Sequence, residues 1–182
     1  MCRAPTTKPP ALHSDMIRIV EYDPAWPARF VREAVAIRSA LGERVLSLEH
    51  VGSTSVSDLP AKPIIDILLV VADSAKEEDY AAALEQAGYE IHVREPEWYE
   101  HRMFKSPDND VHLHIFSAGC PEIDQMLAFR DWLRISQSDR ELYARTKREL
   151  ARHEWKQMQD YADAKTPVVQ EILARMRSSQ PR

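Results

Sequence analysis

The chain has 182 residues, of which 44% are hydrophobic, and a formal net charge of −5 at pH 7. This length suits one domain with a hydrophobic core, and the acidic balance argues against general nucleic-acid binding. No apolar run approaches the ~20 residues that a membrane helix needs, and residues 1–15 lack the apolar stretch of a signal peptide. We therefore expect a cytoplasmic protein without a membrane partner, with a disordered tail over residues 1–15 and one domain over residues 16–178.

The first elements of that domain are a strand, a helix and a second strand. Residues 17–21 alternate as a short strand. The helix that follows can be capped by Asp23, can take Pro24 into its first turn and can end at Gly42. Residues 45–51 then indicate a strand that runs directly into a Gly-Ser turn.

The middle of the chain predicts a buried strand and a helix. Residues 64–71 are apolar on both faces, which is typical of a central strand covered by helices. Ser74 and Glu77 have the spacing of a capping box, which predicts a helix from there to Gly88. A strand over residues 89–93 follows.

Two further strands, over residues 101–105 and 111–116, flank the turn-forming sequence SPDND and predict a β-hairpin. Together with the earlier strands they predict a mixed sheet of about five strands, in a sheet core over about residues 16–117.

A helical cluster is expected over about residues 121–177. Its predicted helices cover residues 121–135, 138–156 and 161–177. The second opens with a capping box of Ser138 and Glu141. In the third, Thr166 can cap a fresh helix with Pro167 in its first turn, or Pro167 can kink a longer helix. The sum is an α+β (α/β-like) fold with a C-terminal helical cluster.

The Gly-Ser turn is the first candidate site. Gly52 lets the backbone approach a ligand closely, and the hydroxyl and N–H groups of Ser53, Thr54 and Ser55 can hold phosphate oxygens. The sequence is neither a Walker P-loop nor a Rossmann fingerprint. An ordinary Ser/Thr loop is the alternative interpretation.

Asp66 is the second candidate, because a carboxylate within an apolar strand is costly unless it is paired or bound to a cation. Proteins typically hold Mg²⁺ with one or two carboxylates together with substrate phosphates. A salt bridge with Lys62, four residues earlier, is the alternative.

The spacing between the turn and Asp66 resembles the nucleotidyltransferase fold, in which the turn handles nucleotide phosphates and strand carboxylates bind the metal. The segments EHVGSTSV, LPAKPIIDILLVV, HLHIF, FRDWLR, LYARTKRELA and YADAK together resemble the GrpB family of that superfamily, over roughly residues 17–176. The resemblance implies the nucleotidyltransferase-like fold and a site for a nucleotide with a metal. The family's reaction is largely unassigned.

The predicted strand departs from active nucleotidyltransferases, which usually carry Asp-x-Asp or Asp-x-Glu there. Leu68 stands at the position of the second carboxylate. Two-metal catalysis needs ligands for both ions, so we expect one divalent metal, with Mg²⁺ favoured and Mn²⁺ or Zn²⁺ as alternatives.

His112 and His114 lie two residues apart in a predicted strand, so they share one face. They can bind a metal together with Asp66, act as bases, or bind phosphate when protonated. One packed and one solvated histidine is the alternative. Asp110 begins this strand, but its place in PDND favours a turn role.

Further candidates surround these residues. Glu49 and His50 precede the turn on opposite strand faces, so only one can face the site, and we favour His50. A set of cations is expected to hold a triphosphate, namely Lys62, Arg102, Arg130, Arg134, Lys147 and Lys165. Tyr161, four residues before Lys165, is a further candidate site residue. Each cation taken alone is more often a surface charge. Trp98 and Tyr99 can stack on a base, although core packing is favoured.

These residues predict a nucleotidyltransferase-fold enzyme. It would bind ATP or another nucleoside triphosphate with a divalent metal, and transfer a nucleotidyl or phosphoryl group to a small-molecule acceptor or activate it. In this hypothesis Asp66 binds the metal, and His112 or His114 is a ligand or general base. The alternatives are a degenerate transferase that binds a nucleotide or another anion without turnover, and a His/Asp metal enzyme acting on an unrelated small molecule.

Overall fold

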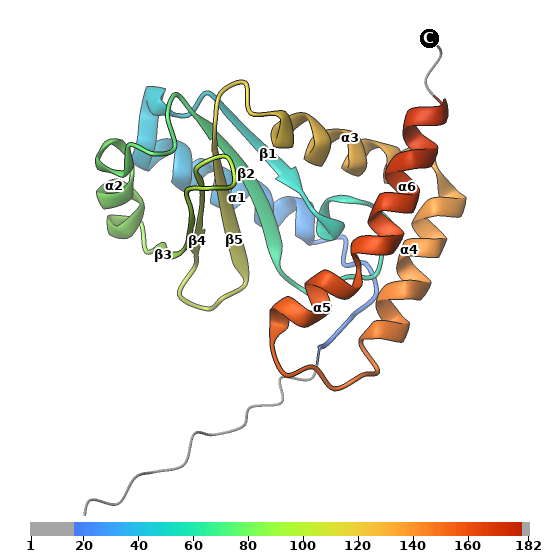
Figure 1. Ribbon diagram of the computed structural model, residues 1–182. Coiled ribbons are helices and arrows are strands. Elements are labelled where there is room, and N and C mark those ends of the chain that lie inside the picture. The colour runs from blue at the N-terminus through green and yellow to red at the C-terminus, as the bar shows by residue number, and fades with distance from the viewer. Residues whose placement is uncertain (1–16, 180–182) are drawn as a thin grey trace, which may run out of the picture.

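A computed structural model describes residues 17–179, so the predicted tail over residues 1–15 lies outside the described residues. Strands form one sheet, and helices lie on both of its faces (Figure 1). The strands are β1 (Ser47–Val51), β2 (Ile65–Val71), β3 (Glu90–Glu95), β4 (His101–Lys105) and β5 (Val111–Ser117). The α-helices are α1 (Trp26–Leu41), α2 (Ala81–Gln86), α3 (Pro121–Ile135), α4 (Gln137–Leu150), α5 (Met158–Ala164) and α6 (Thr166–Ser179). The predicted α+β class is confirmed.

The sheet has the order β1-β2-β5-β4-β3. Only β2 and β5 pair in parallel, while the other neighbouring strands are antiparallel. The central position of β2 explains its composition, since a strand covered on both faces is apolar throughout. Every residue of β2 is buried except Asp66, which is partly exposed.

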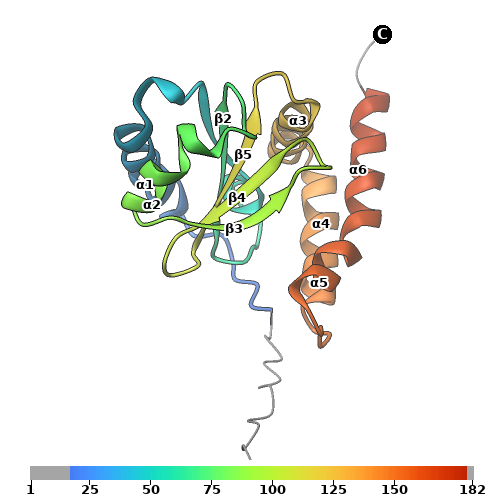
Figure 2. The same cartoon turned by 60° about the vertical axis from the view of Figure 1, so that its left-hand side comes forward.

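Strand parity divides the sheet into two apolar faces. Ile67 and Leu69 point toward α1 and α2, where they pack with Trp26 and Ile37. Leu68 and its neighbours point the other way and lie under α3. Figure 2 shows α1 and α2 on one side of the sheet and α3 to α6 on the other. Asp66 belongs to the second face, by its parity with Leu68.

A second core joins the β1–β2 connection to the C-terminal helices. Val56 and Leu59 of that connection pack with Leu133, Tyr143 and Ile172. This core holds the loop that leads from the Gly-Ser turn into β2. Within residues 17–179, no helix is both long and apolar enough to cross a membrane.

Two predicted caps are wrong. Ser74 is buried and hydrogen-bonds with the hydroxyl of Ser117, 2.9 Å away, so its side chain caps no helix. A 3-10 turn, η3 (Glu77–Asp79), and the short α2 replace the longer predicted helix. Ser136, rather than Ser138, caps α4 by accepting a hydrogen bond from the Asp139 N–H.

The beginning of the domain also differs from the prediction. Residues 17–21 form only an isolated bridge between Val20 and Ala61. Asp23 accepts a hydrogen bond from the Ala25 N–H, and α1 begins at Trp26, so Pro24 precedes the helix. At the other end, α6 is a fresh helix that begins at Thr166. Pro167 therefore lies in a first turn, where its missing N–H costs nothing.

Candidate functional site

The Gly-Ser turn touches Asp66 directly. Gly52 follows β1 with φ +67° and leads into the 3-10 turn η2 (Ser53–Ser55). A Cβ atom at Gly52 would lie 2.3 Å from Asp66 Oδ2. Both the positive φ and this contact require glycine here. The register explains the proximity, because Val51 at the end of β1 pairs with Asp66 in β2.

Asp66, His112 and His114 form the candidate metal centre. Their nearest ligand atoms all lie within 4.8 Å of one another. Asp66 Oδ1 is 3.6 Å from His112 Nδ1 and 3.7 Å from His114 Nε2. These separations are long for direct hydrogen bonds. They match two ligand atoms bound ~2.1 Å from one tetrahedral ion, which lie ~3.4 Å apart.

The charge of Asp66 suits a metal ligand. Burial opposes its ionisation, but His112 and His114 outweigh burial and hold the pKa of Asp66 below its usual range. The carboxylate is therefore ionised at neutral pH. All three side chains are partly exposed, so an ion can reach them from solvent.

A chain of hydrogen bonds runs from His114 through the buried His101 to Glu95. His101 Nε2 lies 3.1 Å from His114 Nδ1, and His101 Nδ1 lies 2.7 Å from Glu95 Oε2. Burial lowers the pKa of His101, which favours a neutral ring. When Glu95 accepts the Nδ1 proton of His101, His101 Nε2 accepts the Nδ1 proton of His114. The His114 Nε2 lone pair then faces Asp66, as a metal ligand requires.

The sequence reading missed Glu95 and His101. A signal existed in the predicted hairpin, because β4 pairs Met103 with His114. Strand alternation then places His101 on the same face as His114.

Lys147 approaches the turn from α4. Its side chain is 3% exposed, and Nζ donates to Ser53 Oγ at 2.9 Å and to the Pro60 carbonyl at 2.5 Å. Within the described residues no carboxylate lies within ion-pair distance of this ammonium. Burial holds the pKa of Lys147 well below its ordinary value. A buried cation without a counter-charge is costly, so the position favours an anionic ligand.

Two more lysines flank the ring of Tyr161 in α5. Lys62 Nζ lies 4.5 Å and Lys165 Nζ 4.9 Å from the ring centroid. The Tyr161 hydroxyl is buried and has no hydrogen-bond partner within residues 17–179. Burial lowers the pKa of Lys62 to about 8, with a further contribution from Lys165 and an opposing one from Asp66.

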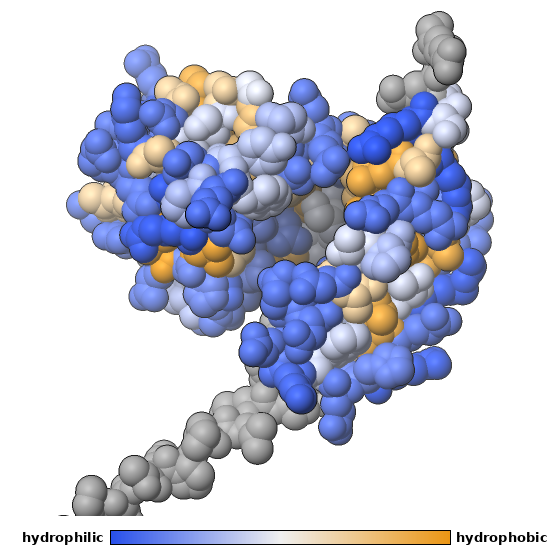
Figure 3. All heavy atoms as spheres, in the orientation of Figure 1, coloured by the Kyte–Doolittle hydropathy of each residue, from blue (hydrophilic) through white to orange (hydrophobic). Residues whose placement is uncertain are grey.

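These groups surround one cavity of about 160 Å³. Its polar lining includes Ser53, Lys62, Asp66, His112, Lys147 and Lys165. The lining therefore combines three lysine side chains with one carboxylate. The space-filling view is hollowed between the sheet region and the C-terminal helices (Figure 3). We call this cavity the Asp66 pocket.

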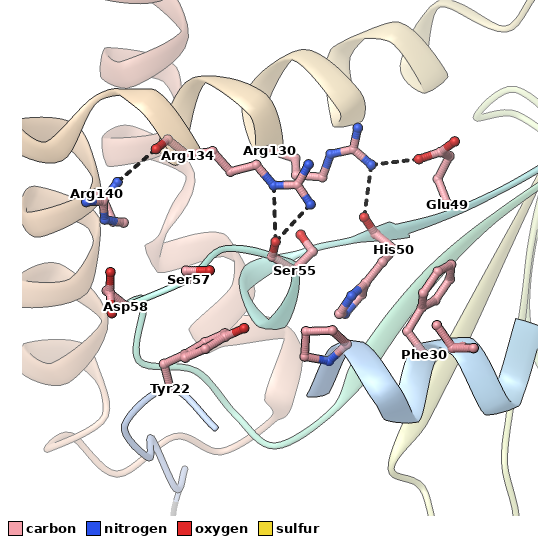
Figure 4. A pocket seen from close by; sticks show the side chains of 12 residues that line it. Tyr22, Phe30, Glu49, His50, Ser55, Ser57, Asp58, Arg130, Arg134 and Arg140 are labelled. Atoms are coloured by element: carbon pink, nitrogen blue, oxygen red, sulfur yellow. Dashed lines mark hydrogen bonds and ion pairs between the residues drawn. The ribbon is translucent and has the colours of Figure 1, made fainter. Parts of the chain in front are cut away.

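Ser55, Arg130 and Arg134 lie at a different cavity, behind the same turn (Figure 4). Arg130 donates to Glu49 Oε2 at 2.9 Å and to the His50 carbonyl at 3.0 Å. Arg134 donates to the Ser55 carbonyl. The structure thus separates these two arginines from the Asp66 pocket.

The prediction that His50, rather than Glu49, faces the same side of the sheet as Asp66 is wrong. Strand parity puts Glu49 on the Asp66 face, while His50 points toward α1 and stacks on Phe30 with ring centroids 4.9 Å apart. Neither side chain lines the Asp66 pocket. His50 Nε2 instead hydrogen-bonds with Thr54 Oγ1, which lines that pocket.

Arg102 is also placed elsewhere. It is buried on the face opposite His114 and donates to Glu77 Oε1 at 2.6 Å. Asp110 accepts from Ser106, which agrees with the favoured turn role. Trp98 is 42% exposed, so the favoured core packing is wrong for it, although its ring edge contacts His101.

Leu68 is fully buried beneath α3. The position of the second carboxylate in active nucleotidyltransferases is therefore covered by a helix. The residues present fit one divalent ion and do not fit a second ion there.

Comparisons with known proteins agree on the family. The family model described as GrpB protein matches residues 16–175. UPF0157 protein BH1888 of Halalkalibacterium halodurans is 61% identical over 163 residues, which cover 90% of this chain and 84% of that protein. The crystal structure of the conserved protein GrpB from Enterococcus faecalis aligns with TM-score 0.73 and 36% identity, over 87% of this chain and 98% of that chain.

The Cid1 poly(U) polymerase, solved with MgGTP, aligns with TM-score 0.44 and 10% identity, over 71% of this chain and 45% of that chain. This likeness is weak and carries no argument about activity. The family match covers nearly all of the described residues and confirms the resemblance seen in the motifs. The chain belongs to the GrpB family.

Proposed function

We propose that this protein binds one divalent metal ion through Asp66, His112 and His114, and binds the phosphate groups of a nucleotide beside it. The proposed reaction is transfer of a nucleotidyl or phosphoryl group to a small acceptor. One observation supports it above all: a carboxylate and two imidazoles lie at ligand spacing, and two of these three residues, Asp66 and His112, line the same pocket as three lysines.

The donor set favours a transition-metal ion. Imidazole nitrogens suit zinc, iron and similar ions, whereas Mg²⁺ prefers oxygen ligands. Two imidazoles with one carboxylate therefore favour Mn²⁺ or Zn²⁺, where Asp66 alone favoured Mg²⁺. When bound, such an ion supplies Lewis acidity at a phosphoryl oxygen.

The protein's own residues supply charge and position. Lys62, Lys147 and Lys165 would neutralise phosphate oxygens, and Ser53 orients Lys147 through its hydroxyl. The pocket, at about 160 Å³, is smaller than the ~300–1,000 Å³ of typical small-molecule sites. It therefore suits the phosphate end of a nucleotide, with the sugar and base outside.

Calorimetric titration tests the proposal. Mn²⁺, Zn²⁺ and Mg²⁺ are titrated separately, and then pyrophosphate and ATP with and without the tightest-binding ion. Wild type should bind an ion, the ion should strengthen ATP binding, and Asp66→Asn should lose both effects. Asp108→Asn, an exposed change of equal charge at the hairpin tip, is the matched control and should behave as wild type. Absence of binding in wild type, or equal binding by Asp66→Asn, contradicts the proposal.

The buried Leu68 favours a second candidate, which is binding of a nucleotide or another anion without turnover. Product analysis after incubation with ATP, the bound ion and a pool of small hydroxyl and carboxylate acceptors separates the two. Product that disappears in Asp66→Asn supports transfer. ATP binding without any product supports the binding protein.

A further inference from the structure

The cavity behind the Gly-Ser turn is separate from the Asp66 pocket. It measures about 640 Å³, within the ~300–1,000 Å³ of small-molecule sites. Residues from α1, β1, α3, α4 and the β1–β2 connection line it (Figure 4). No residue lines both cavities. We call it the arginine cavity, because Arg130, Arg134 and Arg140 border it.

One wall of the arginine cavity carries aromatic side chains. The rings of Phe30 and His50 stack with centroids 4.9 Å apart and planes 9° apart. Tyr22 and Val31 extend this wall, and Val31 is 56% exposed. Burial lowers the pKa of His50 to about 4, so its ring is neutral at pH 7. This wall suits a planar apolar group better than a cation or a sugar.

The opposite wall carries positive charge. Arg134 donates from Nε and Nη2 to the Ser55 carbonyl at 3.2 and 3.0 Å, and Arg140 donates to the Leu133 carbonyl at 2.9 Å. Arg134 Nη1 also pairs with Asp131 Oδ1 at 3.2 Å, which offsets part of its charge. The partners of Arg140 are neutral carbonyls, which orient its guanidinium group without cancelling its charge. Among the described residues no carboxylate lies within ion-pair distance of Arg140. Arg130, in contrast, is paired with Glu49.

We propose that the arginine cavity binds a small molecule that carries a carboxylate or phosphate on a flat aromatic body. The anion would lie at Arg134 and Arg140, since guanidinium groups bind such oxyanions through paired hydrogen bonds. The aromatic body would lie against Phe30 and His50. Arg130 pairs with Glu49 and Asp131, and Arg134 also pairs with Asp131. Arg140 therefore supplies the positive charge that no ion pair offsets among the described residues. This site does not depend on the metal proposed for the Asp66 pocket.

The test uses small molecules that carry an aromatic ring, an oxyanion, or both. Phenyl phosphate, benzoate, inorganic phosphate and benzyl alcohol are titrated by calorimetry into the full chain, in buffer containing a chelator. Phenyl phosphate or benzoate should bind at least tenfold more tightly than inorganic phosphate or benzyl alcohol. Comparison of the first two probes distinguishes a phosphate ligand from a carboxylate ligand.

Variants locate the binding. Arg140→Gln should weaken the better aromatic probe at least tenfold, and Arg134→Lys should weaken it while retaining the charge, because lysine cannot form paired hydrogen bonds. Arg145→Gln, on the exposed face of the same helix, is the matched control and should bind as wild type. Asp66→Asn should also bind as wild type, which separates this proposal from that for the Asp66 pocket.

Three outcomes overturn the proposal. The first is that neither aromatic anion binds wild type. The second is equal weakening by Arg140→Gln and Arg145→Gln, which would indicate general charge attraction. The third is loss of binding in Asp66→Asn but not in Arg140→Gln, which would place the probe in the other cavity.

Discussion

At the scale of single residues, the charges of Asp66 and Lys147 carry the functional proposal. Asp66 is the one partly exposed residue in β2, and it lies within reach of two imidazoles. Lys147 is almost fully buried without a carboxylate in ion-pair distance, among the residues that the structure describes. Such charges cost stability unless a partner of opposite charge compensates them. In a bound metal–phosphate complex, the metal ion would compensate Asp66 and the phosphate would compensate Lys147.

Phosphate binding should depend on pH through Lys62. The pKa of Lys62 is about 8 in the folded protein, and a bound anion raises it by favouring the charged form. Affinity for pyrophosphate should therefore fall as pH rises above about 8, by up to about tenfold per unit. Below that pH, Lys62 adds no dependence. Calorimetry from pH 6.5 to 9.5 measures this.

Lys62→Met is the control for this dependence of pyrophosphate affinity on pH. Pyrophosphate itself titrates, and that contribution is the same in wild type and in the variant. The difference between the two profiles isolates the lysine. Parallel profiles would show that Lys62 does not contact the anion.

The pKa shift of Lys62 affects folding stability with the opposite sign. Between about pH 8 and the ordinary lysine value of ~10.4, the unfolded chain binds more protons, so this contribution to stability rises with pH.

The Glu95–His101 pair should act as a positioning device for His114. Glu95→Gln removes the carboxylate that fixes the His101 tautomer and should weaken metal binding about tenfold to a hundredfold. Glu95 lies on the surface side of the chain of hydrogen bonds, with a side chain 47% exposed, so folding should be unaffected. Glu97→Gln, an exposed neighbour, should leave affinity unchanged.

Metal titration with circular dichroism on both variants decides the point. His101→Gln, which keeps one hydrogen bond to His114 possible, should retain more affinity than His101→Phe. Equal losses in these two variants would indicate packing rather than hydrogen bonding.

At the scale of secondary structure, the site depends on how β1 ends. Val51 is the last residue of β1, and Gly52 turns the chain so that η2 begins against Asp66. The parallel pairing of β2 with β5 then brings His112 opposite Asp66 and His114 two residues further along the same face. Antiparallel β4 adds His101 from the other side. Four strands and one turn thus position the three proposed metal ligands and His101, which hydrogen-bonds with His114.

Gly52→Ala should disturb both the backbone and Asp66. A positive φ costs a non-glycine residue about 1–3 kcal/mol, and the new methyl group would collide with Asp66 Oδ2. Gly119→Ala is a close control, because Gly119 has φ +81° and nothing lies within 4 Å of its added Cβ.

Both variants should lose stability in urea unfolding, whereas only Gly52→Ala should lose metal affinity. Unchanged metal affinity in a folded Gly52→Ala protein would show that the close contact does not position Asp66.

At the scale of the whole molecule, the Asp66 pocket joins two parts of the fold. The sheet supplies Asp66 and His112, while α4 supplies Lys147, α5 supplies Tyr161, and Lys165 directly follows α5. A metal ion would bind the carboxylate and imidazole on the sheet, and a phosphate bound to that ion would contact the lysines of the C-terminal helical part. Ligand binding should therefore restrain the C-terminal helices against the sheet.

Hydrogen exchange measures that restraint. Saturating metal and pyrophosphate should slow amide exchange in α5, because Tyr161 of α5 and Lys165, which directly follows that helix, line the pocket. Exchange in α2, on the opposite face of the sheet, should not change (Figure 2). Equal slowing in both helices would indicate general stabilisation by mass action, and no slowing in α5 would contradict the bridging role.

The local patterns of this sequence determined much of the fold. Apolar continuity marked β2 as a central strand, turn chemistry marked the hairpin of β4 and β5, and the helix predicted over residues 121–135 has the bounds of α3. The wrong caps at Ser74 and Ser138 have different reasons. The hydroxyl of Ser74 is bonded to Ser117, a tertiary contact that the spacing rule does not contain. At α4 two nearby serines compete, and Ser136 caps the helix in place of Ser138.

The sequence alone also placed Asp66 within an apolar strand, and His112 and His114 on the same face of another strand. Alternation in a strand is a local property, so it can be read from the sequence. Only the tertiary structure decided which distant side chains join them. Lys147 meets Ser53 across 94 positions of sequence, while Arg130 and Arg134, on the neighbouring α3, dock behind the turn. Helical spacing tells which residues share a side of a helix, but the packing of that helix against the sheet determines what that side faces.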